Sequence, residues 1–215
     1  MKKQLAAAAL ILSLTLSASP AFARERAPIK VRDVKFDRTA RGWITADVEF
    51  QAGDFAQGEK ARKKDYLSRI KLTLTTGYED RDLANSRKAT AEQKEFPYEF
   101  YQRSVELASV KRSRLITVRF FLPPAVVESK GFPAKPFAWM LGWEVEGLEM
   151  PVDPKRFPDN FSRELHDPKV LTVFQNFLNK NKESNAGVML AQYHGPGSLQ
   201  PKTSKDFAFI RKGED

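Results

Sequence analysis

The stretch ITADVEF at residues 44–50 alternates apolar and polar side chains with a period of two residues. Its apolar members are Ile44, Ala46, Val48 and Phe50. Because successive side chains of a strand point to opposite faces, this pattern predicts a β-strand with one buried face and one solvated face.

The residues before this stretch predict its partner strand. Ile29 and Val31 share one parity, whereas Val34 and Phe36 share the other, so the alternation slips near Arg32-Asp33. A β-bulge or a crossing between two sheets produces such a slip. The polar segment 37–42 indicates a turn, and the two strands are therefore predicted to form a hairpin.

Strand-like patterns recur along the rest of the chain, at residues 66–74, 96–107, 116–122, 137–145, 188–193 and 207–209. The strand at 116–122 is predicted to stop at Pro123-Pro124, because proline lacks the backbone donor that a ladder requires. Pro97 indicates an edge position or a late start for the strand at 96–107. Segment 137–145 is the most apolar, and we predict that it is a central strand.

One segment has helical periodicity. Val170, Phe174 and Leu178 recur at helical spacing after Asp167, a suitable N-cap, and Pro168, which suits the first helical position. A helix is predicted over residues 168–182, with one face on a sheet. A short helical turn is also expected at 125–130, stopped by Gly131.

These elements predict a mostly β fold. We expect an antiparallel β-sandwich of about seven to eight strands with one amphipathic helix near the C-terminus. A closed barrel covered by one helix is the structural alternative.

The first 23 residues have the three parts of a secretory signal peptide: Lys2 and Lys3, the apolar stretch 5–16, and the cleavage site Ala21-Phe22-Ala23. The apolar stretch is shorter than the roughly 20 residues of a membrane-spanning helix, and no later segment is longer. We therefore expect a mature single domain at residues 24–215 without a transmembrane helix. Its expected location is the periplasm, the outer membrane or the exterior of a Gram-negative-type bacterium.

Composition narrows the class of partner. The chain has 215 residues and no cysteine, which excludes disulfides and a cysteine-linked lipid anchor. Its formal net charge of +9 falls to +7 without Lys2 and Lys3, and permits contact with an acidic glycan or an acidic protein. Export, and the spread of basic residues along the chain, argue against nucleic acid as a partner.

Two groups of residues are candidates for binding. Trp43, Tyr98 and Tyr101 could stack against a sugar ring or a partner protein. Lys60, Arg62, Lys63 and Lys64 form the densest basic patch, in a segment predicted to be a loop.

No catalytic residue, metal site or cofactor is predicted. His166 and His194 have no metal-ligand spacing, and neither a nucleophile elbow nor a glycine-rich phosphate loop occurs. Glu144 and Glu146 could act as a carboxylate pair on one strand face, but two acids at that spacing are more typical of the solvated side of a sheet.

Four stretches carry a resemblance to a known group: 28–36, 42–50, 115–128 and 136–147. They resemble exported immunoglobulin-type sandwiches, in particular secreted proteins of mucin-dwelling Verrucomicrobia encoded beside type IV pilus genes. The resemblance implies an immunoglobulin-like sandwich without catalytic residues that works in or near pilus or envelope assembly. A pilin subunit itself would carry a long hydrophobic N-terminal helix, whereas here the apolar segment is short and precedes a cleavage site.

Three functional hypotheses follow. The first is an exported, non-enzymatic binding or assembly module of the cell envelope, associated with a pilus or envelope protein. The second is a carbohydrate-binding module that uses Trp43, Tyr98 and Tyr101. The third and most remote is a periplasmic hydrolase.

Overall fold

The computed structural model describes residues 29–53, 65–80, 82, 85–87, 97–181, 185–199 and 207–210. The predicted signal peptide and the basic patch at residues 60–64 lie outside the described residues. None of the described helices is long and apolar enough to cross a membrane.

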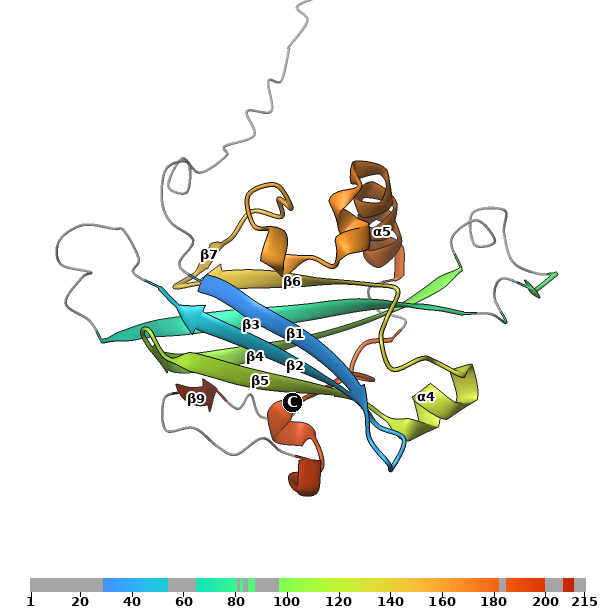
Figure 1. Ribbon diagram of the computed structural model, residues 1–215, viewed down its shortest axis with the longest axis horizontal. Helices are drawn as coiled ribbons and strands as arrows, with labels where there is room; N and C mark the ends of the chain where they lie inside the picture. Colours follow the sequence, from blue (N-terminus) through green and yellow to red (C-terminus); the bar gives the residue numbers. More distant parts are fainter. Residues whose placement is uncertain are drawn as a thin grey trace, which may run out of the picture.

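Two antiparallel sheets form the body of the molecule (Figure 1). The four-stranded sheet has the order β1-β2-β5-β8, and the five-stranded sheet has the order β7-β6-β3-β4-β9. The strands are β1 (Ile29–Arg38), β2 (Ile44–Ala52), β3 (Tyr66–Glu79), β4 (Tyr98–Lys111), β5 (Leu115–Leu122), β6 (Ala138–Val145), β7 (Leu148–Glu149), β8 (Leu190–Ala191) and β9 (Phe207–Ile210). The predicted antiparallel β-sandwich is confirmed.

The division of strands between the sheets follows a known pattern. The first, second and fifth strands share one sheet, and the third, sixth and seventh share the other. Immunoglobulin domains divide their A, B and E strands from their C, F and G strands in the same way. Here the fourth strand lies in the second sheet, beside the third.

The predicted hairpin is formed by β1 and β2, and its register shifts between Val31 and Asp33. The phase slip in the sequence is therefore a β-bulge, because the extra residue lets apolar side chains on both sides of it face the core. Ile29 and Val31 are buried before the bulge, and Val34 and Phe36 pack on the core after it.

Inward-facing side chains of both sheets build the core. Val48 and Phe50 on β2 meet Leu72 and Leu74 on β3 in one buried cluster, and the Phe50 and Trp143 rings lie 4.9 Å apart. Each fully buried side chain of this size contributes about 1.5–3 kcal/mol by leaving water.

The middle of the five-stranded sheet is β3, not β6, so the prediction of a central strand at 137–145 is wrong. The strand is nevertheless apolar for a physical reason. Leu141 and Trp143 enter the core between the sheets, while Ala138 on the other face belongs to a second buried cluster. One face of β6 is therefore covered along its length and the other at its Ala138 end.

Helix α5 (Pro168–Asn181) covers that second cluster (Figure 1). The Phe174 ring packs edge-on against Phe100 of β4, with ring centroids 4.8 Å apart. The helix also begins as predicted, because the Asp167 carboxylate accepts a hydrogen bond from the Lys169 backbone N–H at 2.8 Å. The shorter helix α4 (Pro124–Lys130) ends at Gly131, whose φ of 63° is left-handed.

The chain after β7 runs along three of the four sheet edges. Met140 on β6 forms a β-bridge with Phe161, and Ser162 donates its backbone N–H to the Trp139 carbonyl. Strand β8 pairs with β5, and β9 pairs with β4. The C-terminal part of the chain thereby satisfies backbone groups that these edges would otherwise expose.

Candidate functional site

The three aromatic candidates do not form one platform. Tyr101 is 2% exposed, and its hydroxyl donates to Glu99 at 2.7 Å, so its ring is part of the core and cannot stack against a ligand. Trp43 lies on the other sheet and packs edge-on against Phe121, with centroids 6.1 Å apart. Tyr98 and Tyr101 have opposite parities on β4, so their rings lie on different faces of the sheet.

Tyr98 is half-buried and stacks on Phe137, with ring centroids 4.5 Å apart. Burial, and then the nearby Glu79 carboxylate, raise the pKa of the Tyr98 hydroxyl. The hydroxyl is therefore neutral at physiological pH, and the pair is a small apolar rim beside α5.

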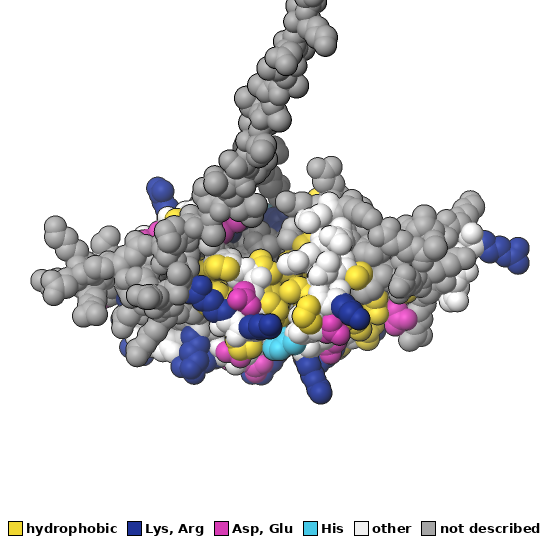
Figure 2. All heavy atoms as spheres, turned by 90° about the horizontal axis from the view of Figure 1, so that it is seen from above, with side chains coloured by type: hydrophobic (Ala, Val, Ile, Leu, Met, Phe, Trp, Pro, Cys, Tyr) yellow, Lys and Arg dark blue, Asp and Glu magenta, His cyan; other side chains and the backbone are white. Residues whose placement is uncertain are grey.

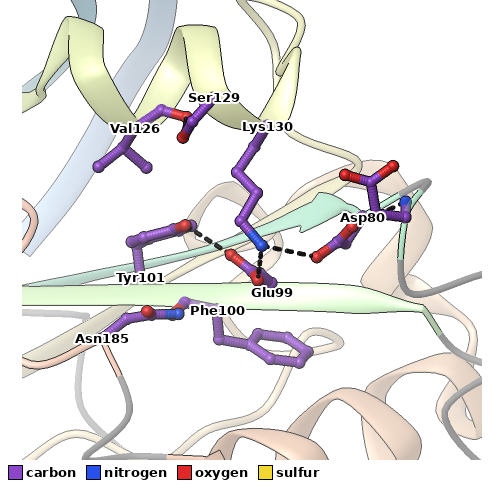
Figure 3. Close-up of polar contacts among 9 residues, drawn as sticks. Asp80, Glu99, Phe100, Tyr101, Val126, Ser129, Lys130 and Asn185 are labelled. Atoms are coloured by element: carbon purple, nitrogen blue, oxygen red, sulfur yellow. Dashed lines mark hydrogen bonds and ion pairs between the residues drawn. The ribbon is translucent and has the colours of Figure 1, made fainter. Parts of the chain in front are cut away.

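A polar cluster closes one end of the sandwich (Figure 3). The Lys130 ammonium at the end of α4 donates to Glu99 at 2.6 Å and to Asp80 at 3.0 Å. Below it, Phe132 stacks on the buried Tyr78 ring at 4.8 Å. Each polar group has a partner and the aromatic side chains beneath are packed, so this cluster fastens α4 to β3 and β4.

A hollow lies at the start of β1, with a volume of about 560 Å³. It lies between β1, the end of β2 and the segment that carries η2 (Pro158–Asn160), and η2 is itself a neighbour of β1. Its apolar lining comes from Ile29, Val31, Ala52 and Phe157. This volume falls in the range of small-ligand pockets, which are mostly apolar with a few polar groups.

A buried amide group faces this hollow. Asn160 is 6% exposed, and its Oδ1 accepts a hydrogen bond from Trp143 Nε1 at 3.3 Å. The Asn160 Nδ2 has no hydrogen-bond partner among the described residues. The Nδ2 atom is accessible to solvent, so the acceptor of a ligand can take the place of water there.

Charged side chains form the rim of the hollow. Lys30 and Arg156 are exposed cations, Asp159 is an exposed carboxylate, and none of the three makes an ion pair with a described residue. The Arg156 guanidinium lies 5.1 Å from the centroid of the Phe157 ring. The three formal charges sum to +1, which suits an anionic group.

Figure 2 shows the molecule from above. Hydrophobic side chains gather near the middle of the described surface, over the segment between β7 and α5. Lys, Arg, Asp and Glu side chains surround them. Val152 in this segment is 48% exposed.

The edge of β1 beside the hollow is open. Within the described residues, the backbone of β1 is hydrogen-bonded only inside the hairpin with β2. The edge carries Lys30, Arg32 and Lys35 as well as the bulge, features that keep an edge strand from pairing indiscriminately. A strand that pairs here must match those charges.

Other candidate groups have structural surroundings. Glu144 pairs with Lys71 at 3.7 Å across neighbouring strands, and Glu146 in the β6–β7 turn accepts from the Ser68 hydroxyl at 3.2 Å. Among the described residues, no three His, Asp or Glu side chains are grouped so as to hold a metal ion. His166 is exposed, and His194 packs against Tyr193.

Sequence reasoning did not identify Arg156, Asp159 or Asn160 as site residues. They lie in a proline-rich and charged segment, and nothing in its pattern shows which side chain becomes buried. Only the contact between Asn160 and Trp143, 17 positions apart, places the amide under the hollow.

No protein-family model matches the chain, and no curated protein matches it. Among solved structures, the fold is similar to a crystal structure of a protein from Akkermansia muciniphila, at 11% sequence identity and a TM-score of 0.43. The likeness covers 57% of this chain and 66% of that one, which is just under two thirds of its length.

Proposed function

We propose that this protein is an exported, non-enzymatic binding or assembly module of the bacterial cell envelope. The proposal rests on the backbone pairing of the sheet edges, because β1 differs from the other edges in having an open side. Hydrogen bonds from the segments after β7 cover parts of the β4, β5 and β6 edges, whereas β1 pairs only with β2 among the described residues.

An open edge strand recognises an extended segment of another protein. Its free backbone groups supply hydrogen bonds, and pockets beside it accept alternate side chains of the added strand. Here β1 offers both, because the hollow begins at Ile29 and Val31. The added segment would extend the four-stranded sheet beyond β1.

Export rests on the signal peptide pattern in residues 1–23. Association with a pilus rests on the sequence resemblance alone. Glycan binding, the second hypothesis, loses its three-residue aromatic platform because Tyr101 is buried and Trp43 lies on the other sheet.

Site-specific photo-crosslinking in the native envelope tests the proposal. A photoreactive residue replaces Lys30 or Lys35 on β1, and the control replaces the exposed Lys169 on α5. We expect one defined protein adduct from both β1 positions and none from α5. Adducts from α5 alone, or none from β1, would contradict the proposal.

A further inference from the structure

The hollow at the start of β1 combines three features that together describe a ligand. It has an apolar lining, the Asn160 amide donor without a described partner, and two cations on its rim, Lys30 and Arg156. An apolar group that ends in a carboxylate matches all three. A neutral apolar ligand would leave the donors unused, and a cation would meet Lys30 and Arg156.

The position of the hollow beside β1 indicates which kind of molecule can carry that group into it. Ile29, Lys30 and Val31 line it and also form the first residues of the open edge. An extended peptide that pairs with β1 therefore reaches the hollow at one end. If its backbone ended there, its last side chain would enter the apolar part and its terminal carboxylate would meet the donors.

We propose that the hollow binds the C-terminal residue of an extended peptide segment, an apolar residue with a free α-carboxylate. This inference rests on the proposed strand addition to β1 and names the chemistry of the partner. Capture of a chain terminus beside a paired strand is a recurring mode of peptide recognition.

The role of each residue follows from its contacts. Asn160 Nδ2 donates to a carboxylate oxygen while its Oδ1 stays on Trp143 Nε1, which fixes the orientation of the amide. Arg156 supplies a charged donor from above the Phe157 ring. Asp159 opposes carboxylate binding, because its own charge lies on the same rim.

The test is NMR titration of the chain lacking residues 1–23 with two probes. One is acetyl-Val-Thr-Val-Leu with a free carboxylate, and the other is the same peptide with a terminal amide. We expect the acid to shift the Asn160 side-chain signals and the backbone N–H signals of residues 29–31. The amide should bind roughly tenfold more weakly, because it forfeits a charge-assisted hydrogen bond.

Variants on the rim separate charge from fold. Arg156→Gln should weaken binding of the acid roughly tenfold, whereas Asp159→Asn should strengthen it several-fold. The matched control is Lys155→Gln, which removes the same charge one position outside the lining and should leave the affinity unchanged. An unchanged amide spectrum elsewhere shows that each variant is folded.

Several results would overturn the inference. These are equal affinity for acid and amide, no binding at millimolar concentration, or shifts that leave Asn160 and β1 unmoved. Decanoate that shifts Asn160 while the peptides leave β1 unmoved would instead identify a fatty-acid pocket. If β1 still crosslinks to a partner but the peptide acid and the peptide amide bind equally well, strand addition is supported and the carboxylate site is refuted.

Discussion

At the scale of single residues, Gly195 lets the C-terminal segment pack closely on the four-stranded sheet. A Cβ atom at Gly195 would lie 2.1 Å from the Phe121 ring, which is fully buried on the outer face of β5. Nearby, the Arg119 guanidinium donates to the Asp47 carboxylate and to the Leu199 carbonyl, and the Arg119 backbone N–H donates to Gln192 Oε1. Removal of any of these contacts loosens the same segment.

We predict that Gly195→Ala lowers the free energy of unfolding by about 1–3 kcal/mol, because the new methyl group must displace Phe121 or the chain above it. Gly197→Ala is the control, since a Cβ at Gly197 meets nothing within 4 Å. Urea unfolding of the two variants measures the difference. Equal stabilities would show that the segment is not packed on Phe121.

The Lys130 ammonium is a second single group that stabilises the fold, because it pairs with Asp80 and Glu99. Lys130→Met leaves the Asp80 and Glu99 carboxylates without their shared cation, and we expect a loss of about 1–2 kcal/mol in the free energy of unfolding. Lys35→Met, which removes an exposed lysine with two carboxylate neighbours, should have a negligible effect. Adding Glu99→Gln to Lys130→Met should restore part of the loss, and a further loss would contradict this account of the cluster.

The raised pKa values in this cluster predict that the folded protein becomes less stable at alkaline pH. Burial raises the pKa of Tyr78 and Tyr101 above 10.0, and the Glu99 carboxylate raises the pKa of Lys130 above 10.5. The folded chain thus keeps protons that the unfolded chain releases at the ordinary pKa. This stabilisation is complete below the unfolded-state pKa and is lost as the pH rises from there through the folded-state pKa.

We therefore expect the free energy of unfolding to fall as the pH rises past about 10. Tyr101→Phe should make that fall shallower, because it removes one of the groups involved. Urea unfolding at a series of alkaline pH values measures both curves. A wild-type curve that is flat up to about pH 11 would rule out the linkage.

At the scale of elements, Gly77 determines how closely α5 approaches the five-stranded sheet. A Cβ at Gly77 would lie 3.0 Å from the Phe174 ring and 3.2 Å from the Phe100 ring. Gly142 on the neighbouring strand offers a contrast, because a Cβ there meets only Thr73 at 3.7 Å, an ordinary contact.

Gly77→Ala should therefore destabilise the protein by about 1–3 kcal/mol and increase amide exchange in α5. Gly142→Ala should be neutral or should stabilise by up to about 1 kcal/mol, because alanine restricts the unfolded chain and has room in the strand. If the two substitutions have the same effect, α5 does not rest on Gly77.

Elements with a clear period could be predicted from the sequence, and short ones could not. The β1–β2 hairpin and its bulge follow from the burial of alternate side chains, and α5 follows from apolar residues at helical spacing. By contrast, β7 and β8 have two residues each, too few to show a period. Their pairing depends on contacts between distant parts of the chain, and so does the central position of β3.

The candidate site was harder to predict than the fold. Tyr101 shares the parity of the buried Val105 and Leu107 on β4, and this signal could have placed its ring in the core. The hollow gives no such signal, because it is assembled from the ends of β1 and β2 and a loop more than a hundred positions away.

At the scale of the whole molecule, the chain after β7 divides the sandwich into covered and open edges. It runs beside β6, adds β8 to β5 and adds β9 to β4, but leaves β1 with one partner among the described residues. This asymmetry leaves β1 as the described edge at which we propose that an extended segment is added. Its binding site would comprise β1 and the hollow.

Amide hydrogen exchange tests strand addition at β1, with the protein measured alone and bound to the partner that crosslinks to β1. Strand addition predicts slower exchange for backbone amides of β1 and of residues 156–160, with β8, β9 and α5 unchanged. Unchanged exchange in β1, with new protection at α5 or on the face of β5, would contradict it.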